Sequence, residues 1–329
     1  MTIFKGPQEM EVEVILASRA DGCQPLYTVR CRYPRIIHGE IMTHRDFSRN
    51  ARSSRAVPIK TMLNEVRNSP FVPWHWGKNQ KGMQGAGDHN QPVIIPYGFV
   101  NDWDFDTPIS REDAWLYARD RAVEVAEAFM TADYHKQIPN RLLEPFSWID
   151  TLISSSRWDN FLWLREHGDA EPHFQDLAKL VGLAIKDAEL QELEPNQWHL
   201  PYITTEDRKF VEGNGMTAAF NVSFLAKISA ARCARISYKP FDGDASYERE
   251  IERYDSLLSS DRVHASPLEH QATPDHMITI EGMMLDKEGN DIEHLGVRDF
   301  WNSPRLHGNL PGWIQYRKTV PGEVYRDPV

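Results

Sequence analysis

The sequence predicts an α+β fold on three observations. Residues 11–16 and 27–33 alternate apolar and polar side chains with the two-residue period of a β-strand. Later in the chain, apolar side chains recur at helical spacing. The sequence has neither a Gly-x-Gly-x-x-Gly motif nor a Walker loop. Nothing therefore indicates a parallel-sheet nucleotide fold.

The first third of the chain combines these two strands with turns and a loop. Residues 20–25, Ala-Asp-Gly-Cys-Gln-Pro, are typical of a turn between the strands, and Pro34 ends the second strand. Residues 35–42 have helical spacing. Residues 69–107 are rich in Pro, Gly, Trp and Asn, which indicates a long ordered loop.

Helical signals dominate the rest of the chain. Ser110 and Asp113 have the form of a capping box. The apolar residues that follow them predict a strongly amphipathic helix at 114–129. Further helices are predicted at residues 149–164, 174–190 and 245–259.

The remaining segments carry weaker signals. We interpret residues 196–214 as a loop and residues 220–237 as short apolar stretches. Gly-Asn and Asp-Lys-Glu-Gly turn signals indicate irregular chain over the last ~50 residues.

Composition and charge restrict the class of protein. The 329 residues suit one elaborated domain or two small ones. A net charge of −11 argues against a general nucleic-acid coat. No apolar run approaches the ~18 residues of a membrane span, and the first residues lack the features of a signal peptide. We therefore expect a cytoplasmic protein without membrane contact.

Cysteine usage points to a reduced protein. Cys23, Cys31 and Cys233 are too few for a disulfide framework or a four-thiolate zinc site. We interpret them as small buried side chains or surface thiols, and we predict no metal site.

A basic, hydroxyl-rich segment at residues 43–55 is the most informative part of the sequence. Its arginines can pair with phosphate oxygens through parallel hydrogen bonds, and serine hydroxyls can bind the remaining oxygens. This composition indicates a pocket for a phosphorylated metabolite. A solvated basic face remains the alternative, and the net charge weakens the case for a nucleic-acid patch.

The order of residues in this segment resembles the signature of the flavin-dependent thymidylate synthases, Arg-His-Arg-x-x-Ser-x-Asn-Glu-x-Ser-x-Arg-Tyr. Six of its nine fixed positions are present: His44, Arg45, Ser48, Asn50, Ser53 and Arg55. Thr43, Ala51 and Ala56 stand where the family has Arg, Glu and Tyr.

Later motifs extend the resemblance. Arg141 lies four residues before Pro145, as in the family, and residues 160–165 read Asn-Phe-Leu-Trp-Leu-Arg. Ala-Arg-Ile-Ser-Tyr at 234–238 and His-Ala-Ser-Pro-Leu-Glu-His at 264–270 are similar to motifs that precede the arginine signature in the family. Here they follow it, which indicates a circular permutation like that of the phage-type branch.

The resemblance implies the architecture. The family fold is a central antiparallel sheet flanked by helices, in a homotetramer with cofactor sites between subunits. We expect residues 1–329 to form one permuted domain of this kind. Inserted loops are expected at about 69–107 and 190–225, with a C-terminal extension at about 275–329.

The resemblance also implies the chemistry. Enzymes of this family methylate the C5 atom of dUMP with carbon from methylenetetrahydrofolate and hydride from FAD that NADPH has reduced. They need no cysteine nucleophile, and none of the three cysteines here follows a proline, as that nucleophile does in the classical thymidylate synthase. A phage-encoded member would work in the cytoplasm of its host.

Site residues follow by position from the family. The cofactor would contact His44, Arg45, Asn160, Leu164, Ser237, His264, Ser266 and Glu269. The nucleotide would contact Glu40, Ser53, Ser54, Arg55, Arg141 and Arg165. Arg165 and Ser53 are the predicted catalytic residues, with Arg165 facing the pyrimidine carbonyls, where its charge would favour electron density on the ring oxygen.

Other functions stay open. Glu40 replaces a family glutamine and cannot donate a hydrogen bond while ionised, so the base could be cytosine. A flavin-dependent hydroxymethylase or dCMP methylase is therefore an alternative. A non-catalytic relative that binds nucleic acid is another, which the charge disfavours.

Individual residues also have structural alternatives. His264 and His270 can cap a turn, Arg141 can bind helix C-terminal carbonyls, and Ser53 or Ser54 can be an N-cap. Residues 74–84 are either a lid over folate or nucleotide or an aromatic surface loop. Residues 312–318 either close over the site or form a subunit contact.

Overall fold

The computed structural model describes residues 2–95, 108–214, 217–236, 243–259, 263–285 and 291–324. For residues 281–285 and 291–297 only the backbone is described. Ser237, one of the predicted cofactor residues, lies outside the described residues.

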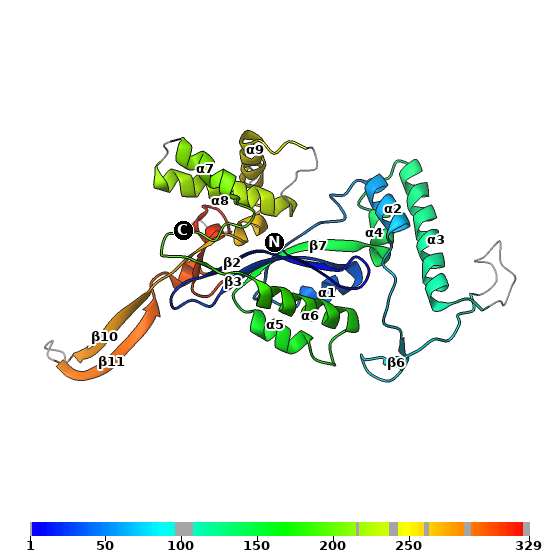
Figure 1. The fold of residues 1–329 in the computed structure, drawn as a ribbon, viewed down its shortest axis with the longest axis horizontal. Helices are drawn as coiled ribbons and strands as arrows, with labels where there is room; N and C mark the ends of the chain where they lie inside the picture. Colours follow the sequence, from blue (N-terminus) through cyan, green and yellow to red (C-terminus); the bar gives the residue numbers. More distant parts are fainter. Residues whose placement is uncertain are drawn as a thin grey trace.

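The fold is α+β, with a central sheet that is antiparallel except at one edge pair (Figure 1). The strand order is β1-β2-β3-β7-β4, and β8 pairs with β2 in parallel. The strands are β1 Ile3–Lys5, β2 Glu11–Arg19, β3 Leu26–Pro34, β4 Ser48–Ala51, β7 Trp148–Ser155 and β8 Gln191–Glu192. The predicted antiparallel sheet with flanking helices is thus confirmed.

Helices cover both faces of the sheet (Figure 1). On one face, α5 (Trp158–Arg165) and α6 (Pro172–Asp187) pack on a core that includes Val29 and Ile153. On the other face, Leu152 of β7 packs with Cys233 of α8. The helices on this side are α7 Thr205–Gly213, α8 Ala218–Arg235 and α9 Tyr247–Leu258.

Further elements lie at the two ends of the sheet. The short helix α1 (His38–Ile41) follows β3 through a 3-10 turn, Arg35–Ile37. A second group of helices has its own apolar cluster. This group is α2 Ile59–Asn68, α3 Arg111–Thr131, α4 Pro139–Leu143 and the 3-10 turn Glu144–Phe146.

The C-terminal region contains small strands and turns that pack on the body. η3 (Ser266–Glu269) leads into β9 (Ala272–Pro274), which pairs with β12 (Trp313–Gln315). Two 3-10 turns flank β12, at Pro304–Leu306 and Tyr316–Thr319. Strands β10 (Met277–Leu285) and β11 (Asp291–Trp301) pair with each other in antiparallel and project from the body (Figure 1).

Several predicted elements are confirmed. Strands β2 and β3 contain the two alternating segments, and a turn joins them. Helices α6 and α9 match the predictions at 174–190 and 245–259 within a few residues. Ser110 is the N-cap of α3 and accepts a hydrogen bond from the Asp113 backbone N–H.

The prediction of one helix at 149–164 is wrong. Residues 148–155 are the strand β7, and the helix α5 begins only at Trp158. Strand β7 is buried on both faces, since Ile153 packs towards α5 and α6 while Leu152 packs towards α8. A strand with apolar side chains on both faces loses its two-residue period, so its sequence is hard to distinguish from that of a buried helix.

Four other interpretations are also corrected. Residues 205–213 are the helix α7, with a full capping box between Thr204 and Asp207, and not a loop. The apolar stretches at 220–237 belong to α8. The C-terminal region contains strands where irregular chain was expected. Helix α3 is only weakly amphipathic, because among its residues only Val123 and Ala126 are buried.

Candidate functional site

Three segments that are distant in the sequence meet beside β4. Strand β4 pairs with β7, so that Ser48 lies opposite Ser154, and β7 leads into α5. The Asn50 side-chain amide donates to the carbonyl oxygens of Cys233 (2.8 Å) and Ala234 (3.1 Å). Ser266 Oγ donates to Asn50 Oδ1 at 3.3 Å. We call this region, where β4, β7 and η3 meet, the junction.

The junction brings together the motifs of the resemblance in their rearranged order. Ser154 Oγ lies 2.9 Å from His270 Nδ1, and both side chains are fully buried. Motif residues at 48–50, 234 and 266–270 therefore contact one another or the same strand within one chain.

The 160–165 motif reaches the arginine segment through Arg165. Its Nε donates to His44 Nε2 at 2.8 Å, and its Nη2 donates to Thr43 Oγ1 at 3.1 Å. The guanidinium also lies over the Phe174 ring, 5.0 Å from the centroid. Burial, with the charges of Arg165 and Arg49, lowers the pKa of His44 to about 4. A neutral His44 can accept the Arg165 N–H.

Residues 312–318 pack on the junction of their own chain. Arg317 forms an ion pair with Glu269, and Gln315 Nε2 donates to Ser48 Oγ (3.0 Å) and to the Glu269 carbonyl oxygen (3.0 Å). Burial raises the pKa of Glu269, although Arg317 opposes that shift. The sequence indicated that residues 312–318 either close over the site or form a subunit contact, but no local pattern pairs Gln315 with Ser48 or Arg317 with Glu269, because these residues lie far apart along the chain.

The predicted phosphate-binding residues lie beyond the other end of β4. Ser53, Arg55 and Arg141 have exposed side chains. Ser54 is buried and donates to Glu144 Oε1 at 2.5 Å. Pro58 is the N-cap of the following helix α2, so the interpretation of Ser53 or Ser54 as an N-cap is wrong.

A cavity of about 730 Å³ lies beside Arg165. Glu40 and Arg165 line it together with residues of a small hairpin, which consists of β5 (Gly77–Lys78) and β6 (Ala86–Asp88). Trp74, Trp76 and Glu171 complete much of the wall. We call this space the hairpin cavity. Two residues predicted to bind nucleotide thus share a cavity with the tryptophan-rich loop.

The base of the hairpin is pinned to α6. Trp74 Nε1 donates to Asp176 Oδ2 at 2.9 Å, and His75 Nε2 lies 2.7 Å from the same oxygen. The Trp74 ring packs edge-on against His173, with centroids 4.5 Å apart. The aromatic loop is therefore anchored at its start, and its outer part borders the cavity.

The carboxylates of the hairpin cavity differ in their partners. Asp88 is paired with Arg111 at 2.9 Å. Glu171 accepts from the Phe174 backbone N–H and contacts His173. Among the described residues, no side-chain partner of the Glu40 carboxylate is present. Glu40 and Arg165 are therefore an acceptor and a donor in the lining of the same cavity.

The other predicted cofactor residues are partly or fully open to solvent. Arg45, Asn160 and His264 are exposed, and Leu164 is 41% exposed. Asn160 and Leu164 are four residues apart on α5 and so share one helix face. The His264 backbone N–H donates to the Leu257 carbonyl oxygen.

The cysteines are not poised for nucleophilic catalysis. Cys31 and Cys233 are fully buried, and burial raises the pKa of both thiols, that of Cys31 to about 12. Cys23 is half-buried, and its pKa is raised to about 11. The thiolate is the reactive form, so these thiols are inert near neutral pH.

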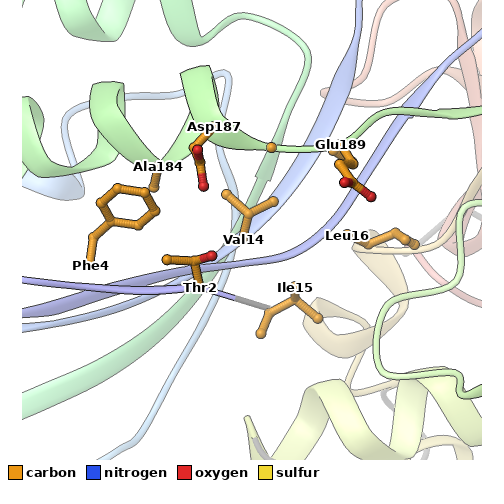
Figure 2. Close-up of a pocket in the computed structure, with 10 residues that line it drawn as sticks. Thr2, Phe4, Val14, Ile15, Leu16, Ala184, Asp187 and Glu189 are labelled. Atoms are coloured by element: carbon orange, nitrogen blue, oxygen red, sulfur yellow. The ribbon is translucent and has the colours of Figure 1, made fainter.

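A second cavity, of about 430 Å³, lies between β2 and the end of α6 (Figure 2). Apolar side chains such as Phe4 and Val14 line it, together with Asp187 and Glu189 (Figure 2). None of the predicted site residues lines this cavity.

The described residues contain neither a metal-ligand cluster nor a membrane-spanning helix. Among the residues that the structure describes, no three His, Cys, Asp or Glu side chains are grouped as metal ligands. None of the helices in the described ranges has the length and hydropathy to cross a membrane.

Comparisons with known proteins provide a structural likeness. No protein-family model matches the chain, and no curated protein matches it. The chain is similar to a crystal structure of the flavin-dependent thymidylate synthase ThyX from Helicobacter pylori complexed with FAD and dUMP. The two are 19% identical over 49% of this chain and 67% of that chain, with a TM-score of 0.31. A likeness of this size shows neither the family nor the function of this chain.

Proposed function

We propose that this protein is an FAD-dependent thymidylate synthase that methylates dUMP at C5 to give dTMP. Methylenetetrahydrofolate and NADPH are the co-substrates, and the enzyme works as a homotetramer in the cytoplasm. The single observation that supports this most strongly is the junction. Motifs that resemble those of the family occur in permuted order, yet they contact one another around β4 and β7.

The residues around the junction suit a flavin. Leu164 and Asn160 offer an exposed apolar and amide face on α5, and Glu269 and Ser266 offer polar groups on η3. His44, Arg45, Ser237 and His264 complete the proposed cofactor set. FAD would supply the hydride, a step that the protein side chains cannot perform.

Arg165 is the proposed electrostatic catalyst. Its guanidinium is oriented by His44 and Thr43 and lies at the wall of the hairpin cavity. A charge fixed in this way stabilises negative charge on a pyrimidine carbonyl oxygen while C5 attacks the incoming carbon. Because His44 is neutral, it holds Arg165 without competing for that oxygen.

The two groups of nucleotide-binding residues support a site shared between subunits. Glu40 and Arg165 lie beyond the start of β4, whereas Ser53, Ser54, Arg55 and Arg141 lie beyond its end. Ser53 is proposed as the second catalytic residue. A homotetramer would let the base-binding group of one copy face the phosphate-binding group of another.

An absorbance spectrum followed by nucleotide titration tests this function. The purified protein should be yellow, should bind FAD, and should convert dUMP to dTMP. Arg55→Ala should weaken dUMP binding roughly tenfold or more by removing a phosphate partner, while its circular dichroism stays unchanged. Arg121→Ala is the matched control, since Arg121 is an exposed arginine on α3 that pairs with Glu124. A colourless protein that takes up no FAD would refute the proposal.

Glu40 favours a second candidate, a dCMP methylase or hydroxymethylase. Its carboxylate lines the same cavity as Arg165 and has no partner among the described side chains. A carboxylate accepts a hydrogen bond from the cytosine amino group but repels the uracil O4. Assays with both nucleotides and mass analysis of the product separate the two. If the protein is a dCMP methylase or hydroxymethylase, Glu40→Gln should shift its substrate preference towards dUMP.

A non-catalytic relative that binds nucleic acid would behave differently in these assays. It would bind RNA or DNA with strong salt dependence and turn over neither nucleotide.

A further inference from the structure

A buried chain of hydrogen bonds crosses the central sheet. Five fully buried side chains form it, from five parts of the fold. Gln191 on the edge strand β8 begins it and donates from Nε2 to Ser18 Oγ at 2.8 Å. The five buried members, in order, are Ser18, His199, Thr28, Ser154 and His270.

The links of this chain are short and continuous. Ser18 Oγ lies 2.6 Å from His199 Nδ1, and His199 Nε2 lies 2.8 Å from Thr28 Oγ1. Thr28 Oγ1 lies 2.6 Å from Ser154 Oγ, directly across the β3–β7 ladder. Ser154 Oγ then contacts His270 Nδ1 at 2.9 Å.

The two histidines of this hydrogen-bond chain, His199 and His270, are neutral. Burial lowers the pKa of His270 to about 3, and burial together with the nearby His270 does the same for His199. A neutral imidazole has one N–H donor and one acceptor nitrogen, and a hydroxyl has one proton to donate. Each member therefore passes on one hydrogen bond for each one it receives.

The direction of the chain follows from its first member. An amide N–H can only donate, so Ser18 accepts from Gln191 and gives its single proton to His199 Nδ1. His199 then donates from Nε2 to Thr28, Thr28 to Ser154, and Ser154 to His270 Nδ1. Any other arrangement leaves at least one hydroxyl proton without an acceptor inside the core, which is costly.

The hydrogen-bond chain ends at His270 with a donor that has no partner among the described residues. If His270 accepts at Nδ1, its proton is on Nε2. This Nε2 atom is buried and has no hydrogen-bond partner among the described residues. A buried donor without a partner is rare in folded proteins. His270 directly follows Glu269 of the proposed cofactor site.

We propose that Gln191 and His199 are positioning residues that hold His270 as the tautomer protonated on Nε2. The N–H at Nε2 binds an acceptor atom of a flat heterocycle, a ring carbonyl oxygen or ring nitrogen. This last link rests on the function proposed above, with the flavin as the heterocycle. Gln191 and His199 belong to the insertion expected at about 190–225, so the insertion acts on the site through the sheet.

Gln191→Glu tests the direction of the chain. At pH 8 a carboxylate can only accept, so Ser18 must donate to it and every hydrogen bond after it reverses. The protein is labelled with ¹⁵N in its histidine rings, and His270 is assigned by comparison with His270→Asn. The unsubstituted protein should show a proton on His270 Nε2, and Gln191→Glu should show it on Nδ1. The control Gln137→Glu, at an exposed glutamine, should leave His270 unchanged.

A titration with FAD tests the last link. Gln191→Glu should bind FAD about tenfold more weakly, since a donor to the ligand becomes an acceptor, and Gln137→Glu should bind within about twofold of the unsubstituted protein.

The outcomes separate the claims. A proton on His270 Nδ1 in the unsubstituted protein overturns the proposal even where the variant fails to fold. A reversed tautomer with unchanged FAD affinity overturns the link to the cofactor. An unsubstituted protein that binds no FAD refutes the proposed function and the last link with it, while the ¹⁵N spectra still decide the positioning role.

Discussion

The junction and the hairpin cavity are built differently, although they take residues from the same part of the chain. Glu40 lines the hairpin cavity, and Ser48, a short distance further along, belongs to the junction. In the junction, Ser48, Ser154 and His270 are fully buried, and hydrogen bonds fix their positions. In the hairpin cavity, Met83 is 99% exposed, and Glu40 has no side-chain partner among the described residues. The junction therefore tolerates few substitutions, whereas the hairpin cavity tolerates more.

The physical cause is the cost of unpaired buried polar groups. A polar atom that loses its partner in the junction has no water to replace it, so each substitution there reduces stability. A polar atom at the cavity wall exchanges its partner for water at little cost. Substitutions at the two regions should separate effects on stability from effects on binding, and the following predictions test that separation.

The largest expected effect is the loss of stability in acid. The pKa of His199 and that of His270 are lowered from 6.5 to about 3 by burial. The unfolded chain binds protons at these residues at higher pH than the folded chain does, so stability is constant above pH 6.5 and falls as the pH drops towards 3. Between pH 7.5 and pH 5 the loss should be about 2 kcal/mol for each histidine.

Urea unfolding at both pH values measures this loss. His199→Asn should reduce the difference between the two pH values by about 2 kcal/mol, the contribution of His199 itself, because His38, His44 and His270 also have lowered pKa values and keep their contributions. An unfolding free energy that is unchanged between pH 7.5 and pH 5 would contradict the neutral histidine pair.

The next prediction compares the loss of stability in two threonine variants. Thr28→Val keeps the shape of a fully buried side chain but leaves His199 Nε2 and Ser154 Oγ without Thr28, at a cost of about 2–3 kcal/mol. Thr43→Val removes an exposed hydroxyl that contacts Arg165, and stability should change by less than about 0.5 kcal/mol. Urea midpoints of the two variants provide the measurement. Equal midpoints would contradict the claim that substitutions reduce stability in the junction and not at the hairpin cavity.

A smaller loss of stability than that of Thr28→Val is expected at the base of the hairpin. Asp176→Ala removes the acceptor of both Trp74 Nε1 and His75, at a cost of about 1 kcal/mol. The hairpin should then open more often, and trypsin should cleave faster at the exposed Lys78 and Lys81. Met83→Ser is the control and should leave both stability and cleavage unchanged. Unchanged cleavage in Asp176→Ala would show that these contacts do not hold the hairpin.

Local patterns in the sequence were enough for several elements. The alternation in β2 and β3 identifies strands because the Glu11–Arg19 and Leu26–Pro34 segments each have a more and a less buried face. The spacing of buried residues in α6 identifies a helix for the same reason. The Ser110 cap needs only neighbouring residues. Each of these signals depends on contacts within a few positions of the chain.

The elements that sequence analysis missed have other causes. Strand β7 is buried on both faces and has no period to detect. The start of α7 does have a local signal, the capping box of Thr204 and Asp207, but the residues around it are mainly polar and resemble a loop. Strands β10 and β11 pair with each other. The turn signals between them were interpreted as irregular chain, although such signals also separate the two strands of a hairpin.

For the site, the sequence by itself determined which residue types are available and, through the spacing of 43–55, 160–165 and 264–270, which segments to compare. Only the tertiary structure decided that Arg165 meets His44, that Arg317 pairs with Glu269, and that His199 links Ser18 to Thr28. Such contacts join residues far apart in the chain. They depend on how the sheet orders its strands and on which polar groups must find partners once water is excluded, and no local pattern records either.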